Sequence, residues 1–156
     1  MVDPSELRWA IDQLAIRNLQ AAYGDAVTRR AWDELVPMFL PDCPIHLDLR
    51  DGRVIEHVGP HAIAAFIATS LEQFEFFEFA LLNAVVLVQD ETTATGRMYM
   101  WELRQNMSHR WTNAYGLYRD QYALVDGRWQ FATRDYSSLA RTSADGDGMN
   151  VFTIPG

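Results

Sequence analysis

Glu102 is the residue of this sequence whose surroundings best suit acid–base chemistry. Met98, Met100 and Glu102 alternate along an apolar segment, so they share one face of a predicted strand. If that face lines a cavity, burial raises the pKa of the carboxyl group and makes it a more effective general base. Alternatively, Glu102 lies beyond the cavity, in solvent or paired with Arg104 or Arg119.

A dense group of aromatic residues follows the third predicted helix and could form the wall of such a cavity. A group of this kind either packs in the core or lines a pocket for a flat hydrophobic ligand. We favour the pocket, and both interpretations can hold together. The residues are Phe74, Phe76, Phe77 and Phe79.

Chemistry that depends on a metal or a disulfide is not expected. No two histidines form an i, i+4 pair on a helix beside a carboxylate, so we predict no metal site. Cys43 is the only cysteine, which excludes an intramolecular disulfide and a zinc site built from cysteines. The histidines are His46, His57, His61 and His109.

The composition limits the class of protein. The chain has 156 residues, 49% of them hydrophobic, which fits one globular domain over residues 1–156 with a sizeable core. A formal net charge of −8 argues against nucleic-acid binding, because phosphates are bound by clustered Lys and Arg. The N-terminus does not resemble a signal peptide, and the apolar run over 76–88 is too short to span a bilayer. We therefore expect a cytoplasmic protein that binds neither nucleic acid nor membrane.

The N-terminal part of the chain predicts three helices and a hairpin. The first helix begins at the capping residue Asp3. Its apolar residues, from Leu7 to Val27, recur at three- and four-residue spacing and form one stripe. The predicted elements are a helix over 3–30, a helix over 31–39, a hairpin over 43–58 with its turn at Asp51-Gly52, and a third helix that opens at Gly59-Pro60.

From Phe76 onward the apolar pattern has a period of two, which predicts strands. The first of these strands is apolar on both faces. We expect a second subunit to cover its outer face, giving a homo-oligomer (a dimer or a trimer) through the sheet. Residues 137–156 form a C-terminal tail that is expected to cover the pocket mouth or to pack on a partner. The predicted strands are 79–88, 93–104, 112–124 and 128–135.

Three local motifs resemble one superfamily. They are the stretch from Tyr23 to Cys43, the segment Gly59-Pro60-His61-Ala62-Ile63, and the turn sequence from Asp126 to Phe131. With the order of the predicted elements, they resemble the SnoaL-like branch of the nuclear-transport-factor-2-like superfamily, near the scytalone dehydratase and hexachlorocyclohexane dehydrochlorinase relatives. The resemblance implies an α+β fold. In it, a cone-shaped, curved antiparallel sheet packs on three N-terminal helices around one apolar pocket for a small hydrophobic molecule.

The resemblance does not extend to the catalytic pair of the dehydratase and dehydrochlorinase relatives. Their base is a histidine on the long central strand, and an aspartate late in the first helix orients it. Phe79 occupies the histidine position here and Thr28 the aspartate position. Neither side chain can take up a proton near neutral pH, so the dehydratase mechanism does not carry over intact.

Other branches use hydrogen-bond donors at positions that this chain retains. Tyr23 matches the oxyanion-binding tyrosine of ketosteroid isomerases, and Asp120 matches their protonated aspartic acid, whereas Leu47 falls where their base lies. Each donor to a developing enolate can be worth about 2.7–4 kcal/mol in a dry site. Tyr23 and Tyr118 could instead be core residues with satisfied hydroxyl groups.

Arg134 matches an arginine near the dehydrochlorinase pocket. There it could neutralise Glu102 or bind an anionic leaving group, and the alternative is a surface ion pair with Asp135. The expected catalytic residues are Tyr23, Glu102, Asp120 and Arg134. The expected substrate contacts are Val27, Thr28, Trp32, Met38, Ile45, Phe66, Leu71, Phe74, Phe79, Asn83, Met100 and Tyr118.

Three functions are consistent with these residues. The first is a cofactor-independent lyase or isomerase that acts on a hydrophobic aromatic or polycyclic substrate. The second is a non-catalytic protein that binds a hydrophobic ligand, which Thr28 and Phe79 favour. The third is a structural subunit like the small subunit of ring-hydroxylating dioxygenases, whose outer sheet face binds a large catalytic partner.

Overall fold

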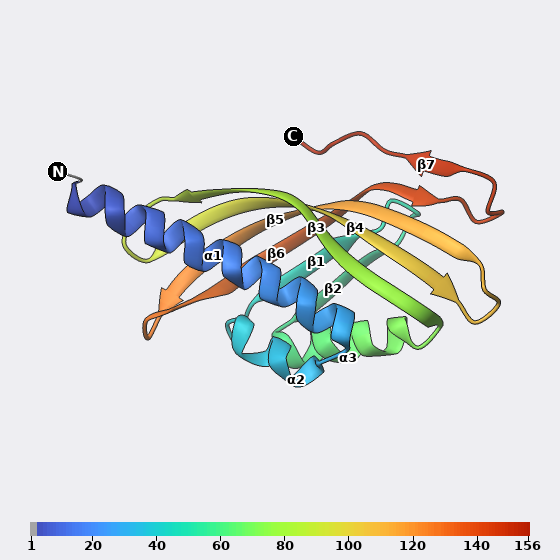
Figure 1. The fold of residues 1–156 in the computed structure, drawn as a ribbon, viewed down its shortest axis with the longest axis horizontal. Helices are drawn as coiled ribbons and strands as arrows, with labels where there is room; N and C mark the ends of the chain where they lie inside the picture. Colours follow the sequence, from blue (N-terminus) through green and yellow to red (C-terminus); the bar gives the residue numbers. More distant parts are fainter. Residues whose placement is uncertain (1–2) are drawn as a thin grey trace.

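The computed structural model describes residues 3–156, and its long first helix, α1 (Pro4–Arg29), lies along one side of a curved sheet (Figure 1). Asp3 caps the helix by accepting a hydrogen bond from the backbone N–H of Ser5 at 2.9 Å. The helix ends at Arg29, and the next residue, Arg30, has a φ of 59° that takes the chain out of the right-handed helical region. Within the described residues, no helix combines the length and the apolar composition that crossing a membrane requires.

The elements follow the predicted order. One predicted helix, over 31–39, is divided into two short pieces, since Pro37 has no backbone N–H to continue an α-helical ladder. After α1 come α2 (Trp32–Leu35), η1 (Val36–Met38), β1 (Pro44–Asp48), β2 (Val54–Val58), α3 (Pro60–Leu71), β3 (Phe74–Val88), β4 (Thr93–Asn106), β5 (Trp111–Val125), β6 (Arg128–Thr142) and β7 (Met149–Val151).

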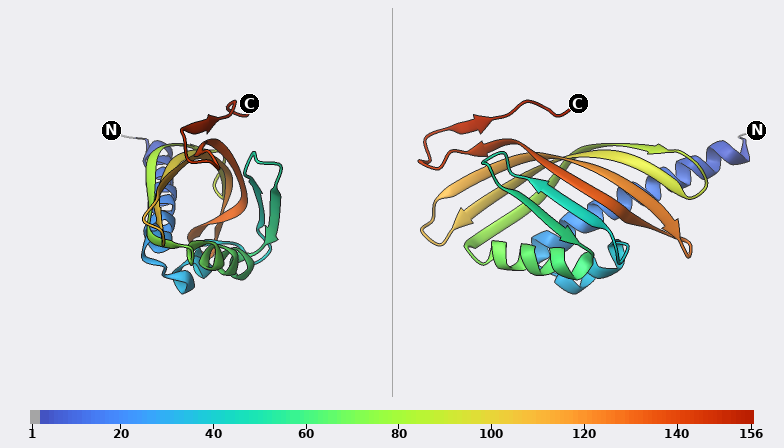
Figure 2. Two further views of the ribbon diagram at one scale, coloured as in Figure 1. Left: turned by 90° about the vertical axis from the view of Figure 1, so that its right-hand side faces the viewer. Right: turned by 180° about the vertical axis from the view of Figure 1, so that it is seen from behind.

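The sheet has the strand order β2-β1-β6-β5-β4-β3, with β7 added alongside β6. Its curvature brings the two edge strands, β2 and β3, toward each other, and α3 lies across the opening between them (Figure 2). The expectation of an antiparallel sheet is wrong at one place. Strand β1 pairs with β6 in parallel, with Ile45 opposite Arg134, so the sheet is mixed.

Two strands extend five or more residues beyond their predicted bounds. Strand β3 begins at Phe74, five residues before the predicted start, and β6 continues through the position where the C-terminal tail was expected to begin, Ser137. Beyond it, β7 forms a short antiparallel ladder with the end of β6, including the pair Ala140 and Val151. Part of the expected tail is therefore sheet, because its backbone groups find partners on β5 and within the tail itself.

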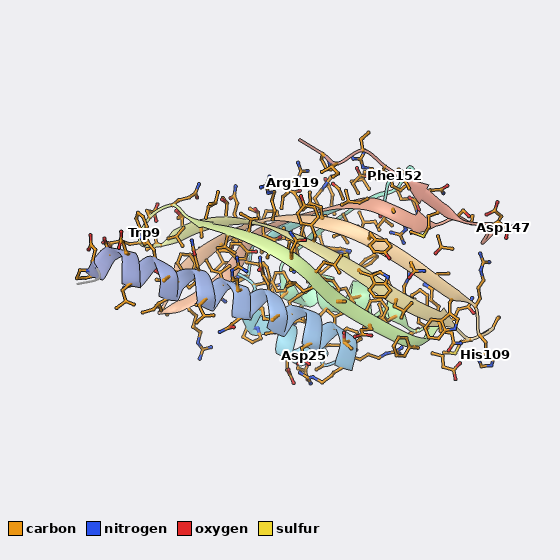
Figure 3. The ribbon with its side chains drawn as sticks, turned by 45° about the horizontal axis from the view of Figure 1, so that its top comes forward. Trp9, Asp25, His109, Arg119, Asp147 and Phe152 are labelled. Carbon is orange, nitrogen blue, oxygen red and sulfur yellow. The ribbon has the colours of Figure 1, made fainter. Side chains whose placement is uncertain are left out.

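The apolar stripe of α1 is buried only in its C-terminal half. Leu7 and Leu14 are 55% and 59% exposed, and Trp9, labelled in Figure 3, is 52% exposed. The face turned toward the sheet carries Asp12 instead, whose carboxylate accepts a hydrogen bond from the indole N–H of Trp129 at 2.9 Å. The buried side of the helix in its N-terminal half is therefore marked by a polar contact to a distant strand rather than by the apolar stripe.

The outer face of β3 is apolar, as expected from the sequence. Leu82, Val85 and Leu87 are exposed there, at 52%, 39% and 61%. Leu82 lies within a register shift between Leu81 and Asn83, which interrupts the alternation of the strand before Val85. Coverage of this face by a second subunit stays a prediction.

Candidate functional site

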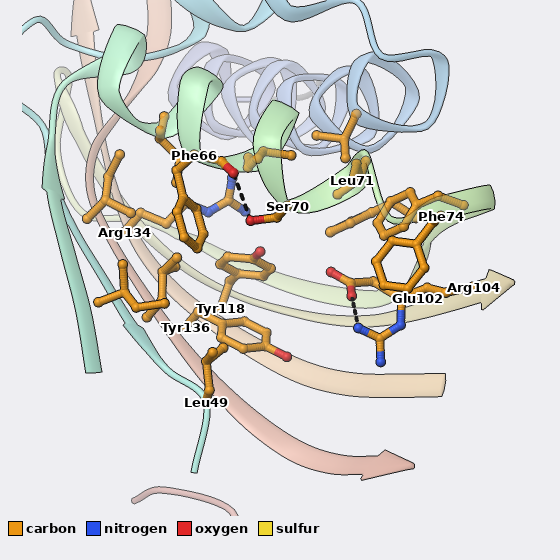
Figure 4. A pocket seen from close by; sticks show the side chains of 18 of the residues that line it. Leu49, Phe66, Ser70, Leu71, Phe74, Glu102, Arg104, Tyr118, Arg134 and Tyr136 are labelled. Carbon is orange, nitrogen blue, oxygen red and sulfur yellow. Dashed lines mark hydrogen bonds and ion pairs between the residues drawn. The ribbon is translucent and has the colours of Figure 1, made fainter. Parts of the chain in front are cut away.

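A cavity of about 250 Å³ lies between the inner face of the sheet and helices α1 and α3 (Figure 4). Aromatic side chains from the start of β3, Phe74, Phe77 and Phe79, form part of its wall. Phe76 does not join them. A register shift between Phe74 and Phe76 breaks the alternation, and Phe76 is 40% exposed and packs on Trp111.

Most of the predicted site residues lie on the wall of this cavity. Their contact with it is an observation, whereas their roles stay predictions. They are Tyr23, Val27, Ile45, Phe66, Leu71, Phe74, Phe79, Glu102, Tyr118 and Arg134.

Several expected substrate contacts lie elsewhere. The hydroxyl of Thr28 accepts a hydrogen bond from a backbone N–H of β3 at 2.9 Å. Met100 is fully buried in the core, and Trp32 and Met38 pack against the core without reaching the cavity. Asn83 follows the register shift in β3 and is exposed. The predicted placement of these residues at the cavity is therefore wrong.

Arg134 occupies the inner end of the cavity and is 1% exposed. Its guanidinium carbon lies 4.0 Å from the ring centroid of Tyr23, 3.9 Å from that of Tyr118 and 4.2 Å from that of Phe131. Such distances allow cation–π attraction, which is strongest in desolvated surroundings. The guanidinium Nε is 3.3 Å from a carboxylate oxygen of Asp120, so neither the predicted pairing with Glu102 nor the alternative pairing with Asp135 is formed.

Asp120 lies behind Arg134 and does not line the cavity, which corrects its predicted place at the substrate. Burial raises its pKa to about 6, although the Arg134 charge and a hydrogen bond from the Tyr122 hydroxyl both act to lower it. That hydrogen bond spans 3.1 Å, and the Tyr122 oxygen in turn accepts one from the amide of Gln20 at 2.8 Å. Asp120 therefore positions Arg134 from the core side.

The Arg134 guanidinium has hydrogen-bonding capacity that the protein does not use. None of its three nitrogens has a hydrogen-bond partner within residues 3–156, because the contact to Asp120 is an ion pair without hydrogen-bond geometry. A buried donor left without an acceptor costs about 1–3 kcal/mol. An acceptor atom of a ligand at this end of the cavity would remove that cost.

Two tyrosines next to Arg134 are suited to donate hydrogen bonds. Burial raises the pKa of Tyr23 and raises that of Tyr118 well above its ordinary value, and the charge of Arg134 opposes the shift in both. Both phenols therefore keep their protons at neutral pH.

The outer end of the cavity carries Glu102 and Arg104 (Figure 4). The Glu102 side chain is 21% exposed, and one of its oxygens lies 3.5 Å from Nη1 of Arg104. Burial raises the pKa of Glu102, while Arg104 and Arg141 act to lower it. Burial also lowers the pKa of Arg104, whose Nη2 donates to the carbonyl of Asn113 at 3.3 Å. Glu102 therefore lines the cavity and also pairs with Arg104, so the cavity position and the ion pair, which were expected as alternatives, are both present.

Arg141 lines the cavity although it was not among the expected site residues, and so does Arg104, which was expected only as an ion-pair partner. Arg104 could have been found by continuing the alternation of Met100 and Glu102 by one more step. Arg141 could not have been found in this way. The pairing of β6 with β5 has a register shift between Tyr115 and Gly116, and this shift interrupts the alternation of β6 before Arg141.

Thr28 and Phe79, which the sequence resemblance predicts to occupy the positions of the relatives' catalytic pair, are adjacent, and neither side chain is a base. The backbone N–H of Phe79 donates to the Thr28 hydroxyl, and the Phe79 ring packs against α1. A Cβ at Gly24 would lie 2.9 Å from that ring, so only glycine lets the helix approach this closely. No histidine lines the cavity in the part of the chain that the structure describes.

No metal site is evident among residues 3–156, since no three His, Cys, Asp or Glu side chains lie close enough together to hold an ion. Cys43 is buried, and burial raises the pKa of its thiol to about 12, which makes it a poor nucleophile. The residues available for chemistry at the cavity are therefore a carboxylate, tyrosines and arginines.

Comparison with solved structures identifies the fold. A scytalone dehydratase-like protein from Novosphingobium aromaticivorans is 18% identical with a TM-score of 0.75, and the match covers 95% of this chain and 92% of that one. The hexachlorocyclohexane dehydrochlorinase LinA type 2 is 18% identical with a TM-score of 0.77, covering 97% and 99%. A nuclear-transport-factor-2-like protein with a cystatin-like fold, also from N. aromaticivorans, is 23% identical with a TM-score of 0.72, covering 94% and 96%.

These similarities show a shared cone-shaped α+β fold. A family model gives the closer assignment, because it matches residues 9–135, most of the chain. This chain belongs to the family of SnoaL-like domains.

Proposed function

We propose that this protein is a cofactor-independent lyase or isomerase that acts on a flat hydrophobic substrate, and that Glu102 starts the reaction by removing a proton from carbon. One observation carries the proposal. Glu102 is the one carboxylate on the cavity wall within residues 3–156, and it faces a cavity whose other end holds a guanidinium with unused donors.

The two ends of the cavity have different roles in the proposed reaction. In Figure 4, Glu102 and Arg134 lie on opposite sides of the Tyr118 ring. A C–H bond of the substrate breaks, the proton goes to Glu102, and the electron pair moves toward a carbonyl oxygen or expels an anionic leaving group. Arg134 and the hydroxyls of Tyr23 and Tyr118 stabilise the negative charge that develops.

Elimination and isomerisation share this first step. In elimination the leaving group departs from the neighbouring carbon and a double bond forms. In isomerisation Glu102 returns the proton to another carbon. The raised pKa of Glu102 favours both, since a base is most effective when its pKa lies near the working pH. Two structural neighbours are named as a dehydrochlorinase and as dehydratase-like, names that denote eliminations, and this adds support at the level of the fold.

Hydrogen exchange of a simple ketone tests the proposal. We expect the protein to accelerate deuterium exchange at the α-carbon of 2-tetralone, a flat bicyclic ketone, in D₂O, as followed by NMR. Glu102→Gln should lower the rate by about 100-fold or more, because it removes the general base. Glu78→Gln, at an exposed position on the neighbouring strand, is the matched control and should leave the rate unchanged. Equal rates for wild type and Glu102→Gln would refute the role of Glu102.

A second candidate is a non-catalytic ligand-binding protein. The contact between Thr28 and Phe79 favours it, because an inert pair occupies the position of the relatives' base. This alternative predicts that 2-tetralone binds to the wild type, with no exchange above the buffer rate after long incubation.

A further inference from the structure

The cavity wall is positively charged although the chain has a net charge of −8. Four arginines and one glutamate contribute to the wall. Three of the arginines have a carboxylate within 4.0 Å: Arg53 pairs with Asp51, Arg104 with Glu102, and Arg134 with Asp120. Arg141 has no such partner within residues 3–156, so the cavity keeps one positive charge in excess.

Arg141 is held in place by uncharged groups. Its Nη1 donates to the hydroxyl of Ser138 at 3.2 Å, and the Tyr136 hydroxyl shares that oxygen at 3.2 Å. Ser138 is fully buried, and burial raises the pKa of Tyr136 to about 12, so this hydroxyl pair stays neutral. The guanidinium is therefore oriented without being neutralised.

Arg104 adds an unused donor at the same end of the cavity. It is 9% exposed, and its Nε is buried without a hydrogen-bond partner in the part of the chain described. The Phe74 ring lies 5.3 Å from its guanidinium carbon, so an apolar wall adjoins the charged group. The structure thus places a surplus cation and an unused buried N–H next to aromatic surface.

We propose that the natural ligand is a hydrophobic carboxylic acid that binds as a monoanion, with its carboxylate held by Arg141 and Arg104 and its ring system against the aromatic wall. One surplus positive charge matches one negative charge, and the planar guanidinium fork fits a carboxylate. This inference rests on the proposed function for the identity of the cavity as the substrate site, and it names the substrate class.

A matched pair of probes tests the inference by isothermal titration calorimetry at pH 7.5. The probes are 2-naphthoate and its uncharged amide, 2-naphthamide, which have nearly the same shape. We expect the wild type to bind 2-naphthoate at least about tenfold more tightly, because hydrogen bonds to a charged group are the stronger ones. Arg141→Gln should remove this preference and leave the Kd for 2-naphthamide unchanged.

Two further variants test whether the preference for 2-naphthoate depends on the charge and shape of the Arg141 side chain. Arg97→Gln is the matched control, since Arg97 is exposed on β4 and does not line this cavity, and it should keep the preference. Arg141→Lys should keep part of it, because the charge remains while the fork is lost. Circular dichroism is the check that each variant is folded.

Equal Kd values for the two probes in the wild type, or binding of neither, would overturn the inference, as would a preference that survives in Arg141→Gln. These results are distinct from failure of the proposed function. If 2-naphthoate binds as expected but exchange of 2-tetralone does not depend on Glu102, the ligand class stands and the reaction fails. If exchange depends on Glu102 but the probes bind equally, the reaction stands and the ligand class fails.

Discussion

The two ends of the cavity hold their arginines in opposite ways. At the inner end, Arg134 is 1% exposed, is surrounded by aromatic rings and is balanced by Asp120 in the core. At the outer end, Arg104 pairs with the partly exposed carboxylate of Glu102, and Arg141 donates to the Ser138 hydroxyl. The inner cation is fixed before a ligand arrives, whereas the outer pair has charge left for a ligand. The inner end is therefore suited to stabilise a developing charge, and the outer end to select a charge that already exists.

The largest effect should come from the inner end. Arg134→Met keeps much of the volume and removes the charge, so we expect deuterium exchange of 2-tetralone to fall by about 100- to 1000-fold, the usual loss for one donor to a developing oxyanion. NMR rates at saturating ketone give this value. Arg97→Gln, at an exposed position on β4, is the control. A variant that keeps more than a tenth of the wild-type rate would show that charge does not develop near Arg134.

The second-largest effect should be a pH dependence of the free energy of unfolding that the Asp120 carboxyl group causes. Its pKa is raised to about 6 in the folded state from an ordinary 3.8, so the folded state holds this proton more tightly than the unfolded state. The resulting stability is fully present below pH 3.8 and is lost as the pH rises through 6. The loss amounts to about 3 kcal/mol by linkage. Urea denaturation between pH 4 and pH 7 measures it.

Asp120→Asn provides the reference for this titration, because it lacks the ionisable group. The free energy of unfolding of the wild type minus that of the variant should fall as the pH rises. Glu102→Gln should give a smaller fall of the same sign, since Glu102 also has a raised pKa but is 21% exposed. A flat or rising difference for Asp120 would mean that Arg134 compensates fully for burial of the carboxylate.

The fold could be predicted from the sequence where local patterns decide the structure. Period-two alternation and turn residues located β1 to β6 but not β7, and Asp3 located the start of α1. The side of α1 that is buried could not be predicted, because its apolar spacing indicates the opposite face in the N-terminal half. Asp12 in that half, and Gln20 further along the helix, face the sheet and form hydrogen bonds with Trp129 and Tyr122, more than a hundred residues away in the chain.

Some residues of the candidate site could likewise be predicted from the sequence. The inner arginine and the outer glutamate both line the cavity, as expected from alternation together with the family resemblance. The ion-pair partner of Arg134 could not be predicted. Arg134 on β6 pairs with Asp120 on β5, and only the folded sheet defines the register between these two strands. Arg141 lies beyond a register shift, so no fixed period reaches it.

The smallest effect should appear at the outer end and should change a pH profile without removing activity. In Arg104→Gln, the pKa of Glu102 should rise, because burial already raises it and the largest opposing charge is lost. The midpoint of the pH–rate profile for 2-tetralone exchange should therefore move to higher pH, with a similar plateau. Arg104→Lys keeps the charge and should return the midpoint toward the wild-type value. If the midpoint stays in place while the plateau falls, Arg104 acts on the transition state, and the two ends of the cavity are not functionally distinct.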